Sequence, residues 1–228
     1  MYKALFFDVD DTLLNFKQCS EAALSKAFDS MNLSYNHSVS ELFYQIDDEL
    51  WSKQKQGLLS VQEVIDCRFS ILLTQMKINA DTNKLKLIFQ ENLSKESIPE
   101  PGACDIIRDL SSNFKLYVAS NGFLKMQQSR LRLVNLLPYF SDIFVSDDIG
   151  YEKPDSYFFD ECLKRSGLKN DEILFIGDSI DADISGAYHS GIATCWYNPN
   201  NKINHSNFKI DYTIRHLCQL KDLVNLEP

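Results

Sequence analysis

The stretch ALFFDVDDTL, residues 4–13, begins as an apolar run and ends in acids. Such a short apolar run predicts a buried strand, in which side chains two residues apart point to the same side. We expect residues 3–8 to form this strand. It would hold Asp8 and Asp10 close together at its carboxyl end, with Asp11 turned away. Because two neighbouring carboxylates repel each other and need a cation, a shared proton or both, the stretch predicts a chemical site.

The size and charge of the chain limit its class. Its 228 residues suit one large domain, or one domain that carries a smaller insert. Apolar residues make up 44% of the sequence, which is enough for a core. The net charge of −9 argues against a nucleic acid polymer or an anionic membrane as partner. A small anionic substrate is compatible with this charge, because a local site can be cationic on an acidic protein.

The six cysteines show neither a disulfide framework nor a zinc site. They stand at positions 19, 67, 104, 162, 195 and 218, without a C-x-x-C pair or a histidine at zinc-ligand spacing. Most are expected to be small core residues in a reducing compartment. No signal peptide or membrane span is recognised, because the first apolar run is short and continues into acids. The protein is therefore expected in the cytoplasm.

The segment that follows the first strand is predicted to be helical. Between residues 16 and 97, apolar residues recur at helical spacing and strand-like alternation is rare. Ser60 and Glu63 form the capping-box sequence of one helix, and Asp81 is suited to cap another. Arg68 is expected to form a salt bridge on a helix surface. Residues 16–97 are therefore expected to form an inserted all-helical cap domain.

From Pro99 the pattern changes to alternating helices and strands. Five further strands are predicted, at residues 115–119, 143–145, 173–176, 193–197 and 212–214. A helix is expected from about Asp181 to Ser190. Short apolar strands separated by helices are typical of a parallel sheet covered on both faces. The expected fold class is α/β, with a doubly wound parallel sheet formed by residues 1–15 and 98–228.

Polar residues follow four of these predicted strands. The groups are Asp8 with Asp10, Ser120 with Asn121, Lys153, and Asp178 with Asp181 and Asp183. Ligands of open α/β sheets bind at the carboxyl ends of strands, so we expect these groups around one crevice. Structural roles are the alternative. Ser120, considered alone, is suited to cap a helix, and Lys153, considered alone, is expected to face solvent.

The groups resemble the four motifs of the haloacid dehalogenase (HAD) superfamily and occur in the same order. The matching stretches are Phe7-Asp8-Val9-Asp10-Asp11-Thr12-Leu13, Ser120-Asn121-Gly122, Gly150-Tyr151-Glu152-Lys153-Pro154-Asp155, and Gly177-Asp178-Ser179 with Asp183. The helical insert between the first and second motifs is similar to the cap domains of this family. The resemblance covers the whole chain and implies a Rossmann-like catalytic core with a helical cap.

The resemblance implies a role for each acid of the site. Asp8 would be the nucleophile that forms an aspartyl-phosphate, and Asp10 would protonate the leaving oxygen and later activate water. Mg²⁺ is the expected cofactor, held by the Asp8 carboxylate, the Asp10 backbone carbonyl and the Asp178 carboxylate. Asp183 is expected to orient a metal-bound water or Lys153.

The other motif residues are expected to bind phosphate or to support the site. Ser120 and the backbone amides of Asn121 and Gly122 would hold phosphoryl oxygens. Lys153 would supply a positive charge to the phosphate and to Asp8. Thr12 is expected to act as a hydrogen-bonding brace.

The form of the first motif narrows the expected substrate. Asp11, with Phe16 soon after it, is similar to the pyrimidine 5′-nucleotidase branch of the superfamily. We therefore expect a Mg²⁺-dependent phosphatase, a monomer or homodimer, that acts on a small phosphorylated metabolite, in particular a nucleoside 5′-monophosphate. The alternatives are a sugar-phosphate phosphatase, a phosphomutase and a non-catalytic protein of this fold. A 2-haloacid dehalogenase is disfavoured, because it needs neither Mg²⁺ nor a second acid at Asp10.

Overall fold

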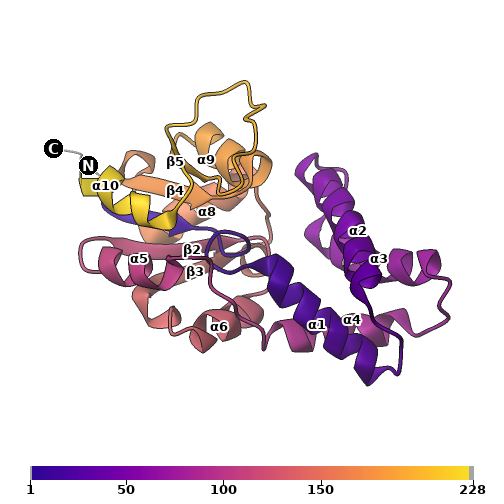
Figure 1. Cartoon of the computed structure of the whole chain (residues 1–228). Coiled ribbons are helices and arrows are strands. Elements are labelled where there is room, and N and C mark those ends of the chain that lie inside the picture. Colours follow the sequence, from indigo (N-terminus) through magenta and orange to yellow (C-terminus); the bar gives the residue numbers. More distant parts are fainter. Residues whose placement is uncertain (1, 226–228) are drawn as a thin grey trace. The chain divides into compact units, whose positions relative to one another are not determined.

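The computed structural model describes residues 2–225 (Figure 1). They form two compact units: a core, made by the chain up to Asn15 and from Ile98 onward, and a helical unit, Phe16–Ser97. The strands of the core are β1 (Ala4–Phe7), β2 (Lys115–Ser120), β3 (Phe140–Val145), β4 (Ile173–Gly177), β5 (Ala193–Tyr197) and β6 (Tyr212–Ile214). They form one sheet in the order β3-β2-β1-β4-β5-β6 with parallel neighbours. The expected α/β class is confirmed.

Helices cover both faces of this sheet. They are α5 (Ala103–Leu110), α6 (Leu124–Leu133), α7 (Ser146–Ile149), α8 (Ser156–Ser166), α9 (Ser185–His189) and α10 (Leu220–Asn225). Side chains of β1 alternate between the faces, so Leu5 and Phe7 pack with α5, α6 and α10. Ala4 and Phe6 pack with α8 and α9 on the other face. The apolar run of residues 4–7 is therefore buried on both sides, as a doubly wound sheet requires.

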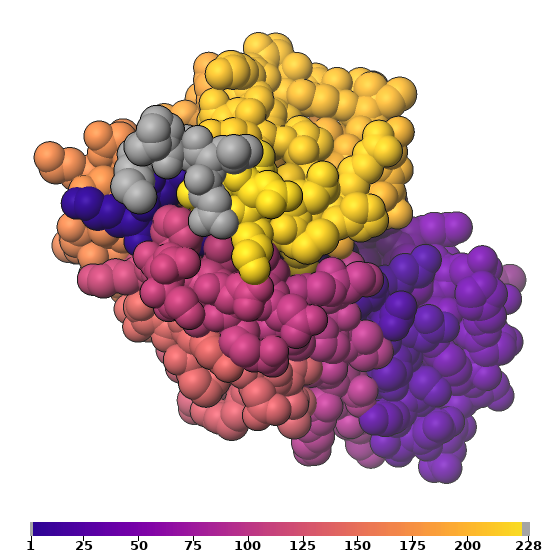
Figure 2. Space-filling view, turned by 60° about the vertical axis from the view of Figure 1, so that its left-hand side comes forward, coloured from indigo at the N-terminus to yellow at the C-terminus, as the bar shows by residue number. Residues whose placement is uncertain are grey.

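The C-terminal helix packs against α5 at the surface of the core. Figure 2 shows the C-terminal residues in yellow beside the magenta segment of α5. Lys221 Nζ lies 3.2 Å from Asp109 Oδ2, but this exposed ion pair contributes little to stability. Leu217 and Leu220 are fully buried, so apolar packing holds this end of the chain.

Two neighbouring segments connect the core to the helical unit. Asn15 N donates to Ile98 O at 2.8 Å, and Glu100 N donates to Leu13 O at 2.9 Å. The Asn15 side chain also donates from Nδ2 to Glu100 Oε1 at 2.8 Å. Hydrogen bonds therefore tie the two connections together on the core side.

The helical unit contains four helices. They are α1 (Phe16–Ser30), α2 (His37–Lys55), α3 (Val61–Gln75) and α4 (Thr82–Leu93). The predicted capping box is confirmed, because Ser60 N donates to Glu63 Oε2 at 2.7 Å and Glu63 N donates to Ser60 Oγ at 3.2 Å. Asp81 caps α4 by accepting from Lys84 N at 3.0 Å. Within residues 2–225, no helix is both long and apolar enough to cross a membrane.

Arg68 is buried, so its expected position in a surface salt bridge is wrong. Its Nη1 lies 3.2 Å from Asp47 Oδ1, and both side chains are almost inaccessible. The guanidinium also lies 4.9–5.6 Å from the ring centroids of Phe43, Phe69 and Phe89. The carboxylate and the aromatic faces together compensate the buried positive charge.

Two elements differ from their predicted form. Strand β3 begins at Phe140, before the predicted residue 143, because its first part carries exposed polar side chains that hide the strand pattern. The chain after β4 makes a π-helical turn, η3 (Ile180–Ile184), before α9 instead of a continuous α-helix. Ile184 N donates to Ser179 O at 3.1 Å, and Ser179 Oγ accepts from Ala182 N at 3.2 Å. This wide turn brings the side chain of Asp183 back to the end of β4.

Candidate active site

The carboxyl ends of three adjacent strands, β2, β1 and β4, carry the polar residues of the candidate site. Asp8 follows β1, Ser120 ends β2, and Asp178 follows β4. In the parallel pairing, the carboxyl end of β1 lies beside the carboxyl ends of β2 and β4. The three strand ends therefore lie at one edge of the sheet. Lys153 joins them from the loop between α7 and α8.

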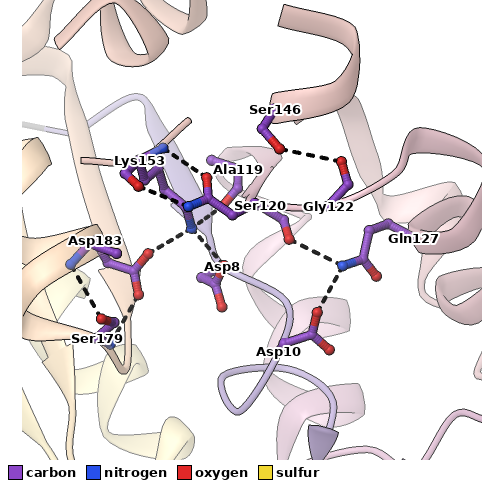
Figure 3. Close-up of polar contacts among 12 residues, drawn as sticks. Asp8, Asp10, Ala119, Ser120, Gly122, Gln127, Ser146, Lys153, Ser179 and Asp183 are labelled. Atoms are coloured by element: carbon purple, nitrogen blue, oxygen red, sulfur yellow. Dashed lines mark hydrogen bonds and ion pairs between the residues drawn. The ribbon is translucent and has the colours of Figure 1, made fainter. Parts of the chain in front are cut away.

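Lys153 is a buried cation at this edge (Figure 3). Its Nζ donates to Asp8 Oδ1 at 2.6 Å, to Asp183 Oδ1 at 2.6 Å and to Ala119 O at 2.8 Å. Burial lowers the pKa of Lys153, but Asp183 and Asp8 more than offset this effect and raise it above its ordinary value. Lys153 is therefore a charged ion-pair partner in the interior and not the solvated lysine of the plainer reading.

Burial and Lys153 have opposite effects on the pKa of Asp8. The pKa of Asp8 is raised to about 7, because burial, the largest effect, outweighs the opposite effect of the Lys153 ammonium. The carboxylates of Asp183 and Asp10 add to the increase. Any further positive charge at this edge favours the ionised form of Asp8, which is the form that can attack an electrophile.

Asp10 has different partners, although it stands only two residues from Asp8. Arg130 Nη1 donates to Asp10 Oδ1 at 2.6 Å, and Gln127 Nε2 donates to Asp10 Oδ2 at 2.9 Å. Gln127 Nε2 also donates to Ser120 Oγ at 3.1 Å, so one amide links the ends of β1 and β2 (Figure 3). The two carboxylates of the first motif are therefore unequal in their surroundings.

Asn121 fixes the loop that carries Lys153. Its Nδ2 donates to Lys153 O at 2.8 Å, and its Oδ1 accepts from Lys153 N at 2.7 Å. The sequence suggested only the backbone amide of Asn121 as a functional group. The structure adds a second task for this residue, since its side chain holds the lysine backbone in register with the end of β2.

Thr12 does not brace the site through its hydroxyl. Within the described part of the chain its Oγ1 is buried and has no hydrogen-bond partner. The turn is closed by its backbone instead, because Thr12 N, Leu13 N and Leu14 N all donate to Val9 O, at 3.3, 2.9 and 2.9 Å. The turn that carries Thr12 is therefore closed by backbone hydrogen bonds.

A family model for haloacid dehalogenase-like hydrolases matches residues 2–191. The chain belongs to this family. The predicted membership of the HAD superfamily is confirmed. This hydrolase is 36% identical over 227 residues to the Bacillus subtilis protein named HAD-hydrolase YfnB, covering 99% of the chain and 97% of YfnB. A crystal structure of YfnB bound to magnesium has a TM-score of 0.93 to it, at 35% identity, and covers 99% of each chain.

Two further relatives carry names that state an activity. The hydrolase is 30% identical to the pyrimidine 5′-nucleotidase PynA of Streptococcus pneumoniae, over 98% of this chain and 95% of PynA. It is 29% identical to the glyceraldehyde 3-phosphate phosphatase of Methanocaldococcus jannaschii, over 98% of this chain and 97% of that protein. Both names describe enzymes that act on phosphate monoesters.

Three carboxylates at this edge are close enough to share a cation. One oxygen from each of Asp8, Asp178 and Asp183 lies within 4.8 Å of the others. A set of oxygen donors with this charge fits Mg²⁺. Asp183 already accepts at both oxygens, from Lys153 Nζ at 2.6 Å and from Ser179 N at 3.0 Å. It is therefore well placed to orient neighbouring groups.

Gly177, at the end of β4, allows the close approach of Asp183. A Cβ atom on Gly177 would lie 2.4 Å from Asp183 Oδ2 and 2.5 Å from its Cβ and Cγ. Asp183 cannot move away easily, because it is bound to Lys153 and to Ser179 N. Gly177 is therefore required by space and not by backbone conformation.

Gly177→Ala is expected to displace Asp183 and to lower the free energy of unfolding by about 1–3 kcal/mol, as overpacking does. Urea denaturation measures this loss, and we expect catalytic turnover to fall with it. Gly167→Ala is the control, because a Cβ there meets nothing within 4 Å and only the φ of 67° is strained. The control should lose about 1 kcal/mol and keep its turnover. Equal turnover in both variants would contradict the role given to Asp183.

Sequence reasoning missed Gln127 and Arg130. Both lie on α6 and are buried, with exposed fractions of 2% and 0%. A signal was available, because two polar residues at i and i+3 stand beside the apolar positions Met126 and Leu131 of this helix. Polar residues on the buried face of a helix need partners, and here the partner is Asp10.

Proposed function

We propose that this hydrolase releases phosphate from phosphate monoesters through an aspartyl-phosphate on Asp8. The observation that carries the proposal is the unequal surroundings of two carboxylates two residues apart. Asp8 is buried against Lys153, with 9% of its side chain exposed, whereas Asp10 is held by Arg130 and is 30% exposed. Two acids in different surroundings can divide the work of nucleophile and proton carrier.

The proposed reaction has two steps. In the first, a carboxylate oxygen of Asp8 attacks phosphorus, the ester P–O bond breaks, and protonated Asp10 gives its proton to the leaving oxygen. In the second, Asp10 takes a proton from water, which attacks phosphorus and breaks the bond to Asp8. Inorganic phosphate leaves. The proposed phosphate ligands are Ser120, the backbone amides of Asn121 and Gly122, and Lys153.

We further propose Mg²⁺ as the cofactor. The Asp8 and Asp178 carboxylates and the Asp10 backbone carbonyl would hold it, and when bound it supplies positive charge to the phosphoryl oxygens. Asp183 would keep Lys153 in place. The six free cysteines among the described residues support the proposal that the enzyme works in a reducing compartment, the cytoplasm.

The proposed substrate is a nucleoside 5′-monophosphate. Two observations support it: Asp11 in the first motif, and the relative named pyrimidine 5′-nucleotidase, which aligns with almost the whole chain. A sugar phosphate is the second candidate, supported by the relative named glyceraldehyde 3-phosphate phosphatase. The helical unit, residues 16–97, is proposed to serve as a cap domain that excludes water during the reaction.

A panel of monophosphates with and without Mg²⁺ tests these proposals. We expect inorganic phosphate to be released from UMP, CMP and dTMP faster than from sugar phosphates. Excess EDTA should stop the release, and Mg²⁺ added beyond the chelator should restore it. Release from sugar phosphates alone would contradict the nucleotide assignment, and no release from any ester would contradict the phosphatase assignment. Halide release from a 2-haloacid in EDTA would favour a dehalogenase.

A further inference from the structure

The amide of Gln127 has its orientation fixed by three contacts. Nε2 donates to Asp10 Oδ2 at 2.9 Å and to Ser120 Oγ at 3.1 Å, while Oε1 accepts from Arg130 Nη1 at 3.2 Å. The reverse orientation would place the amide oxygen against a carboxylate and the NH₂ group against a guanidinium. Only one orientation therefore satisfies all three partners.

Close packing also restricts the side chain of Gln127. A Cβ atom on Gly122 would lie 3.2 Å from Gln127 Nε2, which is tighter than ordinary contact. Gln127 itself is 2% exposed, so its side chain has little freedom to turn. The amide is thus a rigid link between the end of β2 and Asp10.

Arg130 completes the cradle of Asp10 from the same helix. It is fully buried, and its Nη1 donates both to Asp10 Oδ1 at 2.6 Å and to Gln127 Oε1. Burying a guanidinium is costly unless the charge is paired and hydrogen-bonded. The two oxygens of Asp10 are therefore held separately, one by each side chain, which fixes the plane of the carboxylate.

We infer that Gln127 and Arg130 are positioning residues that aim Asp10 at the leaving oxygen of the substrate. The inference rests on the proposed function, in which Asp10 is the proton carrier. Proton transfer needs the acid within hydrogen-bond reach of the leaving oxygen, so a carboxyl group free to rotate loses part of its effect. Gln127 and Arg130 themselves touch neither the substrate nor the phosphoryl group in this scheme.

The chemistry of the leaving group separates positioning from mere support of the fold. The alkoxide that leaves a nucleoside 5′-monophosphate needs a proton, whereas p-nitrophenolate leaves p-nitrophenyl phosphate without one. Since kcat/KM covers only the steps up to transfer of phosphorus to Asp8, the ratio of kcat/KM for the two esters reports proton donation. Any loss of folding or of phosphate binding is common to both esters and cancels in this ratio.

Gln127→Met tests the inference, because methionine has a similar length but no N–H donor. We expect kcat/KM for the best nucleoside monophosphate to fall about 10- to 100-fold, part of the 10²–10⁴-fold effect of a general acid, and that for p-nitrophenyl phosphate to change less than threefold. Arg130→Lys keeps the charge and should lose less than Arg130→Met. The matched controls are Gln128→Met and Arg132→Lys on the same helix. Circular dichroism and melting temperature identify any variant that fails to fold.

The outcomes are distinguishable. A selective loss with the nucleotide supports the inference. An equal loss with both esters, or no loss with either, in a folded Gln127→Met variant contradicts it and leaves the phosphatase assignment intact. A wild-type protein inactive on both esters contradicts the proposed function and the inference together.

Discussion

Asp8→Asn is expected to reduce phosphate release by roughly 10⁴-fold or more, as removal of a nucleophile does in other enzymes. The amide cannot attack phosphorus. It can still accept a hydrogen bond from Lys153, which now lies 2.6 Å from Asp8 Oδ1, so the fold should survive. Release of inorganic phosphate from the best ester of the panel measures the loss. Rapid acid quenching followed by mass spectrometry should show a phosphorylated protein for the wild type only.

Asp11→Asn is the matched control for this variant. Asp11 is exposed and has a φ of 61°, a conformation that asparagine adopts as readily as aspartate. The control removes one carboxylate from the same motif and should retain turnover. If Asp8→Asn turned over like the wild type in pure protein, Asp8 would not be the nucleophile.

Lys153→Met is expected to cost both stability and turnover. The variant leaves the carboxylates of Asp8 and Asp183 buried without their shared cation, and breaking a buried pair in this way costs about 3–5 kcal/mol. Urea denaturation in EDTA measures the loss, because a bound cation would mask it. Lys125→Met, at an exposed position of α6, is the control and should change neither quantity.

A second variant separates the two effects of losing Lys153. Lys153→Met combined with Asp183→Asn removes one of the two repelling carboxylates, so it should recover part of the unfolding free energy. Turnover should remain low, because the variant still lacks the positive charge that Lys153 supplies to Asp8 and to the phosphate. A single Lys153→Met variant with wild-type stability and turnover would refute both roles of this lysine.

The sequence pattern predicted the sheet well, because strand burial leaves a local signal. β5 and β6 have the bounds predicted for them, β2 and β4 are one residue longer at their carboxyl ends, and β1 is one residue shorter at each end. The predicted β3 is shorter than the observed strand, because the first residues of the strand carry polar, exposed side chains. The π-helical turn Ile180–Ile184 escaped prediction, since a helical pattern over a few residues does not distinguish hydrogen bonds to the fourth residue from bonds to the fifth.

Side-chain partners at the site were harder to predict than the strands. Gln127 and Arg130 meet Asp10 across 117 and 120 residues of sequence, and no local pattern announces that contact. Arg68 was assigned to a surface because charged residues usually lie there, yet Asp47 and three rings make its burial tolerable. In each case a partner distant in sequence decides where a charged side chain lies.

The contacts of Lys153 set the charge that a substrate meets. When Asp8, Asp178 and Asp183 are ionised they carry three negative charges, and the ammonium of Lys153 returns one positive charge. The cluster then has a net charge of two negative. A divalent cation would cancel this charge, whereas a monovalent cation would cancel half of it. A phosphate dianion arriving before the cation meets net repulsion, and one arriving after it meets a neutral cluster. If Mg²⁺ and a phosphate ester bind here as proposed, electroneutrality favours an order in which the metal ion binds first and the ester second.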